Sequence, residues 1–184
     1  MIRKCNPEDF EQIFKIINNA AEIYREIIPP EHWHNPYMTP ENLEQEIAGG
    51  ITFYGYQEKG RLLGVMGIQP LDDVTLMRHA YVYTARQQQG IGGGLLTYLY
   101  GLTNGPVLIG TWADAFWAIR FYQKYGFNLA PQEETMDLLY RYWKAPKWHM
   151  ERSVVLADKR WFDLHQLFSN YQQSWRTSRG ENNQ

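Results

Sequence analysis

A polar, glycine-rich bend joins a β-rich run to an apolar helical run near the middle of the chain. It spans residues 87–93 and reads QQQGIGG. A helix that begins here exposes several backbone amides and the positive end of its dipole, which together suit an anion such as a pyrophosphate. Glycines without a Cβ also let a ligand approach the backbone closely. A tight turn packed against a neighbouring strand would explain the same glycines without any ligand.

Two other phosphate-binding motifs do not fit this bend. A Walker loop ends in Gly-Lys-Ser or Gly-Lys-Thr, and the sequence contains neither. A dinucleotide fingerprint requires a third small residue where this chain has Leu95. The bend therefore predicts a phosphate site of another kind.

The elements that must position the bend follow from the hydrophobic period. Asn6 and Pro7 open a first helix, and Asp114 is predicted to cap a later helix that carries Tyr122 and ends at Gly126. Alternating runs bounded by turn residues predict strands between these helices. The expected order is a strand at 2–5, helices at 7–24 and 39–50, strands at 52–57, 62–69 and 74–84, the bend and its helix, a strand at 107–111, the helix at 114–126, a strand at 127–130, a helix at 132–143 and a strand at 150–156.

Composition places the chain among globular proteins. It has 184 residues, 44% of them hydrophobic, and a formal net charge of −2, which predicts no binding to nucleic acid or to an anionic membrane. Cys5 is the single cysteine, so the sequence predicts neither an internal disulfide nor a zinc cluster. With no apolar signal or membrane segment, a cytoplasmic location is expected. One domain is predicted over residues 1–162, followed by a polar tail at 163–184 that is expected to be partly disordered.

Two motifs at this separation resemble the GCN5-related N-acetyltransferase (GNAT) family. The first is RHAYVYTARQQQGIGGGLL, in which Gln87, Gly90 and Gly92 meet the family's Gln/Arg-x-x-Gly-x-Gly/Ala signature. The second is AIRFYQKYGF, with an aromatic-Tyr pair before a Gly-Phe. The element order is also similar, and the resemblance covers about residues 1–156. The segments GTWADAFWAIRFYQKYGF and ERSVVLADKRWF are similar to a bacterial subgroup whose acceptor is unassigned.

The resemblance implies a fold, a co-substrate and a set of site residues. The fold is α/β (α+β), with a mixed, mostly antiparallel sheet flanked by helices. The co-substrate is acetyl-CoA, without a metal. Tyr122 matches the tyrosine that protonates the departing thiolate, a role that a phenol can fill, whereas the alternative is a core aromatic. The implied acetyl-CoA contacts are the backbone of Ala80, Tyr81 and Val82 for the pantetheine arm, and Gln87, Gln88, Gln89, Gly90, Ile91, Gly92 and Gly93 for the pyrophosphate.

The chain departs from the family pattern at two places. Ala115 stands where many relatives place an asparagine that contacts the cofactor. The strand positions of a glutamate base correspond to Leu76 and Gly110, which cannot accept a proton. The base is therefore open between an ordered water and a residue of the first helix and its loop, for which the candidates are Glu22, Glu26, His32 and His34.

The acceptor side is predicted from the resemblance together with strand alternation and ring-rich segments. If the family's active-site face carries positions 76 and 78, Arg78 points towards the acceptor, where it either pairs with a substrate carboxylate or covers apolar surface. His79 should point the opposite way, which favours a core histidine. Trp33, Tyr37 and Trp112 are predicted to wall the acceptor pocket.

These residues predict an acetyltransferase that acts on a primary amine of a small molecule or a peptide. A non-catalytic module that binds acetyl-CoA is the alternative, favoured by the missing base and by Ala115 and opposed by Tyr122. A modifier of peptidyl lysine or of a ribosomal protein is a third reading, and a homodimer is compatible with the sequence.

Overall fold

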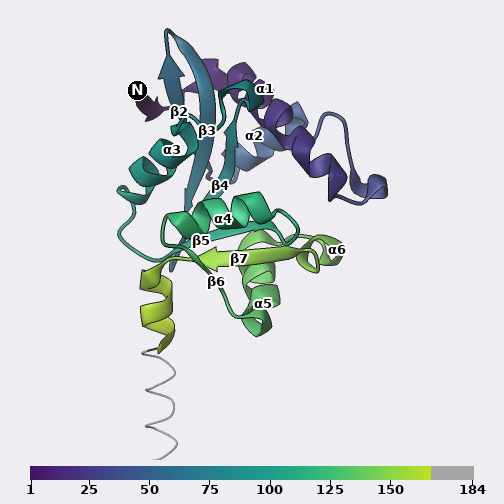
Figure 1. The fold of residues 1–184 in the computed structure, drawn as a ribbon, viewed down its shortest axis with the longest axis vertical. Helices are drawn as coiled ribbons and strands as arrows, with labels where there is room; N and C mark the ends of the chain where they lie inside the picture. The colour runs from purple at the N-terminus through teal and green to yellow at the C-terminus, as the bar shows by residue number, and fades with distance from the viewer. Residues whose placement is uncertain (167–184) are drawn as a thin grey trace, which may run out of the picture.

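The computed structural model describes residues 1–166 as a seven-stranded mixed sheet with helices on both faces (Figure 1). The strand order is β1-β2-β3-β4-β5-β7-β6. The strands are β1 (Ile2–Lys4), β2 (Thr52–Glu58), β3 (Arg61–Pro70), β4 (Thr75–Val82), β5 (Val107–Trp112), β6 (Asn128–Leu129) and β7 (Ser153–Ala157). The α-helices are α1 (Phe10–Ala21), α2 (Pro40–Ala48), α3 (Ile91–Tyr100), α4 (Phe116–Lys124), α5 (Gln132–Trp143) and α6 (Lys147–Met150), and the 3₁₀ helices are η1 (Pro7–Asp9), η2 (Glu22–Glu26), η3 (Pro30–His32) and η4 (Thr84–Arg86).

The sheet divides where β4 meets β5. The strands β1 to β4 pair antiparallel, as do β5 with β7 and β6 with β7. β4 and β5 are parallel and pair only through Thr75 with Val107, Leu76 with Leu108 and Met77 with Ile109. Beyond these pairs the two strands diverge, so the ends of both strands keep backbone groups without a sheet partner on this side. The predicted fold, a mixed and mostly antiparallel sheet between helices, is confirmed.

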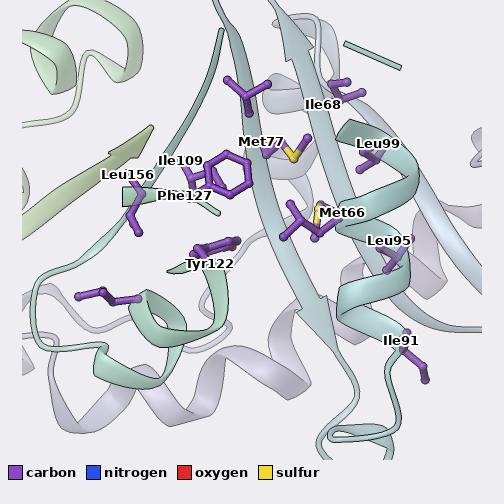
Figure 2. Packing of buried hydrophobic residues seen from close by; sticks show 13 residues of the cluster. Met66, Ile68, Met77, Ile91, Leu95, Leu99, Ile109, Tyr122, Phe127 and Leu156 are labelled. Carbon is purple, nitrogen blue, oxygen red and sulfur yellow. The ribbon is translucent and has the colours of Figure 1, made fainter. Parts of the chain in front are cut away.

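Side-chain alternation sends neighbouring residues of each strand into different cores. Val65 packs with α1 and α2, whereas Met66 packs with α3 and α4. In the same way Leu76 faces α5 and Met77 faces α4. Figure 2 shows the α3–α4 side, where Leu95 of α3 lies across from Met66 and the ring of Tyr122 lies nearer β5. The helices thus hold the two diverging strands from both faces.

The structure corrects two details of the sequence reading. The residue before α4 is Ala115, and the predicted cap by the Asp114 side chain does not form. Instead the backbone carbonyl of Asp114 accepts a hydrogen bond from the amide of Phe116. The short helix α6 was not predicted, and β7 begins at Ser153 rather than at residue 150. Gly126 does adopt the left-handed conformation expected after a helix, with φ of 87°.

The end of the described chain is helical from residue 159 to residue 166, and Trp161 within it is buried. The predicted tail at 163–184 therefore falls largely outside the described residues, which end at 166. In the described part, no helix combines the length and the apolar character needed to cross a membrane. Residues 1–166 also contain no group of three or more His, Cys, Asp or Glu side chains placed to hold a metal ion.

Candidate active site

A cleft of about 570 Å³ lies beside the diverging end of β4, within the usual size range of ligand sites. One wall is the end of β4, from Ala80 to Val82, and the opposite wall is α4 with Phe121 and Tyr122. The floor includes Met66 of β3. The glycine bend closes one end, so both predicted cofactor-binding segments meet at this cleft.

The bend turns into α3 through two left-handed residues. Gln88 has φ of 59° and Gly90 has φ of 79°, a conformation that glycine adopts without strain. The first amide with a helical partner is that of Gly94, which donates to the carbonyl of Gly90 at 2.9 Å. The amides before it have no helical acceptor, as at any helix start, and they are the donors expected to meet an anion.

The glycines of α3 differ in what a side chain would meet. A Cβ on Gly92 would stand 3.6 Å from the Phe121 ring, which is ordinary contact, so the open space there belongs to the cleft. A Cβ on Gly93 would collide with the Tyr125 hydroxyl. A Cβ on Gly94 would touch only Ile2, and Gly94 does not line the cleft. Gly92 is therefore the α3 glycine at which the absence of a side chain leaves space in the cleft.

Two cationic side chains border the same cleft. Arg86 donates from Nη2 to Glu58 at 2.7 Å, while its Nε is buried without a partner. A buried donor without an acceptor is costly, so a ligand oxygen there would be well accommodated. Lys124 lines the cleft from the end of α4 and forms no ion pair with any residue in the described part. These observations fit a polyphosphate ligand.

The predicted acetyl-CoA contacts can now be placed. Gln89 does not line the cleft. The side-chain amide of Gln87 donates from Nε2 to the carbonyl of Val82 at 3.2 Å and so ties the bend to β4. The contacts themselves remain predictions. The residues that do line the cleft are Ala80, Tyr81, Val82, Gln87, Gln88, Gly90, Ile91, Gly92 and Gly93.

Tyr122 combines core packing with exposure to the cleft. Its ring contacts Phe121, with 5.1 Å between ring centroids, and only 8% of the residue is exposed. The hydroxyl forms no hydrogen bond with any residue that the structure describes. Burial raises the pKa of Tyr122, so the phenol keeps its proton. The two readings of Tyr122, packing and proton donor, are therefore compatible in one side chain.

Comparison with protein families decides what kind of domain this is. Residues 49–129, from the start of β2 to β6, match the family model of the acetyltransferase (GNAT) domain. The chain contains a GNAT acetyltransferase domain. The prediction of the family is confirmed, and with it the prediction of an acyltransferase. A sequence search of the curated proteins finds no match.

Solved structures with the same fold are distant in sequence from this chain. PaiA N-acetyltransferase of Thermoplasma acidophilum, solved with coenzyme A, has a TM-score of 0.66 at 18% identity over 86% of this chain and 98% of that one. The ribosomal-protein-S18-alanine N-acetyltransferase of Escherichia coli gives 0.61 at 16% identity over 86% and 92%. A GNAT acetyltransferase of Elizabethkingia anophelis, solved with acetyl-CoA, gives 0.57 at 19% identity over 86% and 96%. At these identities the likeness establishes the fold.

A second, smaller cavity of about 140 Å³ adjoins the cleft of the GNAT domain. It lies where β4 and β5 have separated, between Arg78 and Gly110. Tyr24 and Tyr81 line both spaces and therefore stand at their junction. The two cavities therefore meet beside the gap between β4 and β5.

The structure corrects the predicted orientation of His79. Its φ of 52° is left-handed, so strand alternation fails here and His79 lines the second cavity together with Arg78. The imidazole Nε2 is buried without a hydrogen bond and lies 3.6 Å from a carboxylate oxygen of Glu46. His79 is thus not the satisfied core histidine that alternation favoured. A left-handed non-glycine residue is unusual and often marks a functional site.

Arg78 lines the second cavity, and its predicted contact with a substrate stays a prediction. Its guanidinium pairs with both carboxylate oxygens of Glu46, each at 3.0 Å, and donates to Gln69 at 3.2 Å. The Glu46 carboxylate therefore accepts from the guanidinium N–H groups of Arg78 that were expected to bind a substrate carboxylate. Burial favours a higher pKa for Glu46, but the contacts with His79 and Arg78 outweigh it and lower the pKa, so Glu46 is ionised.

The other predicted acceptor residues divide into two groups. Tyr37 and Trp112 line the second cavity, whereas Trp33 lies behind Tyr37, with 5.8 Å between ring centroids. None of the four predicted base candidates lines either cavity. His32, for example, stacks on Trp148 at 3.6 Å. These four candidates are Glu22, Glu26, His32 and His34.

Sequence reasoning missed Glu46, and it did not consider His149 as a lining residue. His149 stacks on Trp112 at 4.2 Å and lines the second cavity, and burial lowers its pKa. A glutamate on an amphipathic helix looks like ordinary solvated surface, and no local pattern shows that α2 lies over β4. His149 sits in the short unpredicted helix α6, which left it without a structural context.

Proposed function

We propose that this protein transfers the acetyl group of acetyl-CoA to a primary amine by direct attack of the amine on the thioester. The observation that carries the proposal is a cleft with bare helix amides at one end and the Tyr122 hydroxyl in its wall. Proteins of the same fold were solved with coenzyme A and with acetyl-CoA, which supports the choice of donor. Ala115 is fully buried and offers no side chain to the donor.

The proposed donor site uses two parts of the cleft. The pyrophosphate would meet the amides of residues 88–93, the buried Nε of Arg86 and the Lys124 ammonium. The pantetheine arm would pair with the backbone of Ala80, Tyr81 and Val82, which β5 does not reach. The amides at the start of α3 and the Nε of Arg86 have no acceptor in the described chain, so the ligand would satisfy groups that folding leaves open, whereas the Val82 carbonyl already accepts from the side chain of Gln87.

The transfer moves one proton from nitrogen to sulfur overall. The amine nitrogen forms a bond to the carbonyl carbon, the carbon–sulfur bond breaks, and the sulfur keeps its electron pair. The nitrogen must lose a proton on one side of the gap and the sulfur must gain one on the other. The products are an amide and coenzyme A with a free thiol.

Tyr122 is proposed as the group that protonates the sulfur. It is a buried phenol of the donor cleft, contributed by α4, and its raised pKa ensures that the proton is present. A buried phenol is a weak acid, but the same apolar surroundings also disfavour a thiolate, so the two pKa values rise together. General acid catalysis then requires only that the hydroxyl be in hydrogen-bond reach of the sulfur.

His79 is proposed as the group that receives the proton from nitrogen. Two imidazoles line the second cavity, and they differ in their neighbours. The ionised Glu46 lies 3.6 Å from Nε2 of His79, so in the neutral ring the hydrogen would sit on Nε2 and the lone pair on Nδ1. Once Nδ1 has taken the proton from nitrogen, the same carboxylate would stabilise the imidazolium. His149 stacks on Trp112, and burial lowers its pKa and so disfavours its charged form. The carboxylate therefore makes His79 the better base.

The test measures binding and turnover separately. Acetyl-CoA affinity is measured by calorimetry, and thiol release is followed with a panel of primary amines while the acetylated products are identified by mass. Amine-dependent thiol release with matching amide formation is expected. If the protein binds acetyl-CoA and no amine accelerates thiol release, the alternative of a non-catalytic binding module replaces the proposal.

A further inference from the structure

The size of the second cavity limits what can reach the thioester from that side. Its volume is about 140 Å³. An apolar cavity of about 150 Å³ engineered into another protein holds one benzene molecule, which gives a scale for this space. The cavity therefore has room for a single six-membered ring or an alkyl group of similar volume.

Tyrosine and tryptophan side chains and two imidazoles make up half of the residues that line this cavity. Tyr24 and Tyr37 stack with 6.3 Å between their centroids, and Trp112 lies against His149. Trp143 reaches over β5 because Gly110 has no side chain, since a Cβ there would lie 3.0 Å from the indole. Walls of this kind favour a flat or apolar body and bind a cation through their ring faces.

The charges around the cavity do not suit a polycation. No Asp or Glu in the described chain is among the lining residues, and the Arg78 guanidinium contributes a positive charge. Glu46 stands behind Arg78 and His79 and is already paired. An acceptor with a second ammonium would have to bury it without a counter-ion, which is strongly unfavourable.

We propose that the second cavity is the acceptor subsite and that it takes a compact monoamine carrying one aromatic ring, of which benzylamine is the probe. The proposal rests on the acetyl transfer proposed above. A polyamine would bury a second ammonium without a counter-ion, and the aromatic side chains favour a ring over the small side chain and backbone of a peptide that begins with alanine. The amine enters with its nitrogen towards Tyr24 and Tyr81, at the junction with the donor cleft.

The first experiment compares kcat/KM for benzylamine, spermidine and a peptide beginning with alanine at saturating acetyl-CoA. We expect benzylamine to exceed both others by at least about tenfold, the factor that a modest difference in binding free energy produces. A preference for spermidine or for the peptide would overturn the acceptor class while leaving acetyl transfer intact. Absence of turnover with every amine would instead contradict the proposed function.

The second experiment changes the size of the subsite. Trp143→Ala should shift preference from benzylamine towards a naphthylmethylamine and leave acetyl-CoA affinity unchanged, because Trp143 lines only the second cavity. Trp143→Leu is the milder variant if the alanine variant fails to fold. Tyr140→Ala is the matched control, an aromatic residue on the same helix that is 72% exposed. An unchanged ratio of the two amines in a folded Trp143 variant would refute the assignment of this cavity.

Discussion

Tyr122 and His79 differ in the charged state that their surroundings allow. Tyr122 is enclosed by apolar groups, so burial raises its pKa and the phenol keeps its proton. His79 has an ionised carboxylate beside one ring nitrogen, so a positive charge on the imidazole is compensated. A proton donor on the donor side and a proton acceptor on the acceptor side are what transfer from nitrogen to sulfur requires.

Tyr122→Phe should separate the packing role of this ring from its chemical role. The variant keeps the ring and removes a hydroxyl that has no hydrogen bond within the described chain, so stability should change by no more than about 1 kcal/mol. Acetyl-CoA affinity should be unchanged, while the single-turnover rate should fall by about 10² to 10⁴, the range for general acid–base catalysis. A folded variant with an unchanged chemical rate would show that the thiolate leaves unassisted or receives its proton elsewhere.

His79→Asn should test the proposed base on the acceptor side. The imidazole lines the second cavity beside the Glu46 carboxylate and is proposed to receive the proton from nitrogen, so kcat/KM should fall by about 10² to 10⁴, the range for general acid–base catalysis. Acetyl-CoA affinity should be unchanged, because His79 does not line the donor cleft. His149→Asn, a second imidazole of the same cavity, is measured alongside and should lose less. An unchanged kcat/KM in a folded His79→Asn variant would assign the base to another group.

At the level of elements, the hydrophobic period and the turn residues carried most of the information. The hairpin between β2 and β3 was predictable, because Gly60 separates two β-rich runs. Lys59 and Gly60 do form its turn, with φ of 47° and 79°. The helix after the glycine bend was predictable as well. Local pattern could not predict the left-handed His79, which lies in a bulge of β4 opposite Met66, or the approach of Glu46, which depends on the tertiary placement of α2. The acceptor side was therefore predicted less completely than the donor side.

The start of α3 offers a matched pair of substitutions. Gly92→Val places two methyl groups in the donor cleft, and we expect acetyl-CoA affinity to fall by at least about tenfold, since the amides are no longer approachable. Gly94→Val makes the same change two residues later, away from the cleft, and should leave affinity unchanged. Both variants should fold, because neither Cβ has a neighbour closer than 3.6 Å. Calorimetric titration with acetyl-CoA and thermal melting measure the two effects. Equal affinities for the folded pair would show that the pyrophosphate lies elsewhere.

At the scale of the whole molecule, the short β4–β5 pairing leaves the two parts of the sheet joined by few backbone hydrogen bonds. Asp158, only 2% exposed, adds a connection at the edge of this junction. Its carboxylate accepts from the amide of Val107 at the start of β5 at 3.0 Å and from the Tyr100 hydroxyl at the end of α3 at 3.0 Å. It also pairs with Arg160 at 2.5 Å, and Arg160 donates to the carbonyl of Thr103. One carboxylate thus ties α3, β5 and the last described helix together.

Asp158→Ala should therefore destabilise the whole domain rather than one element. The substitution leaves the buried amide of Val107 without its side-chain acceptor and removes the counter-ion of a partly buried Arg160, so the free energy of unfolding should fall by about 3 kcal/mol. Asp163→Ala removes the carboxylate of an exposed pair with Lys159 and should change it by less than about 0.5 kcal/mol. Urea unfolding followed by circular dichroism measures both. Similar losses in the two variants would mean that the Asp158 contacts contribute no more than a surface ion pair, and that the sheet pairs and the helix packing alone hold the two parts together.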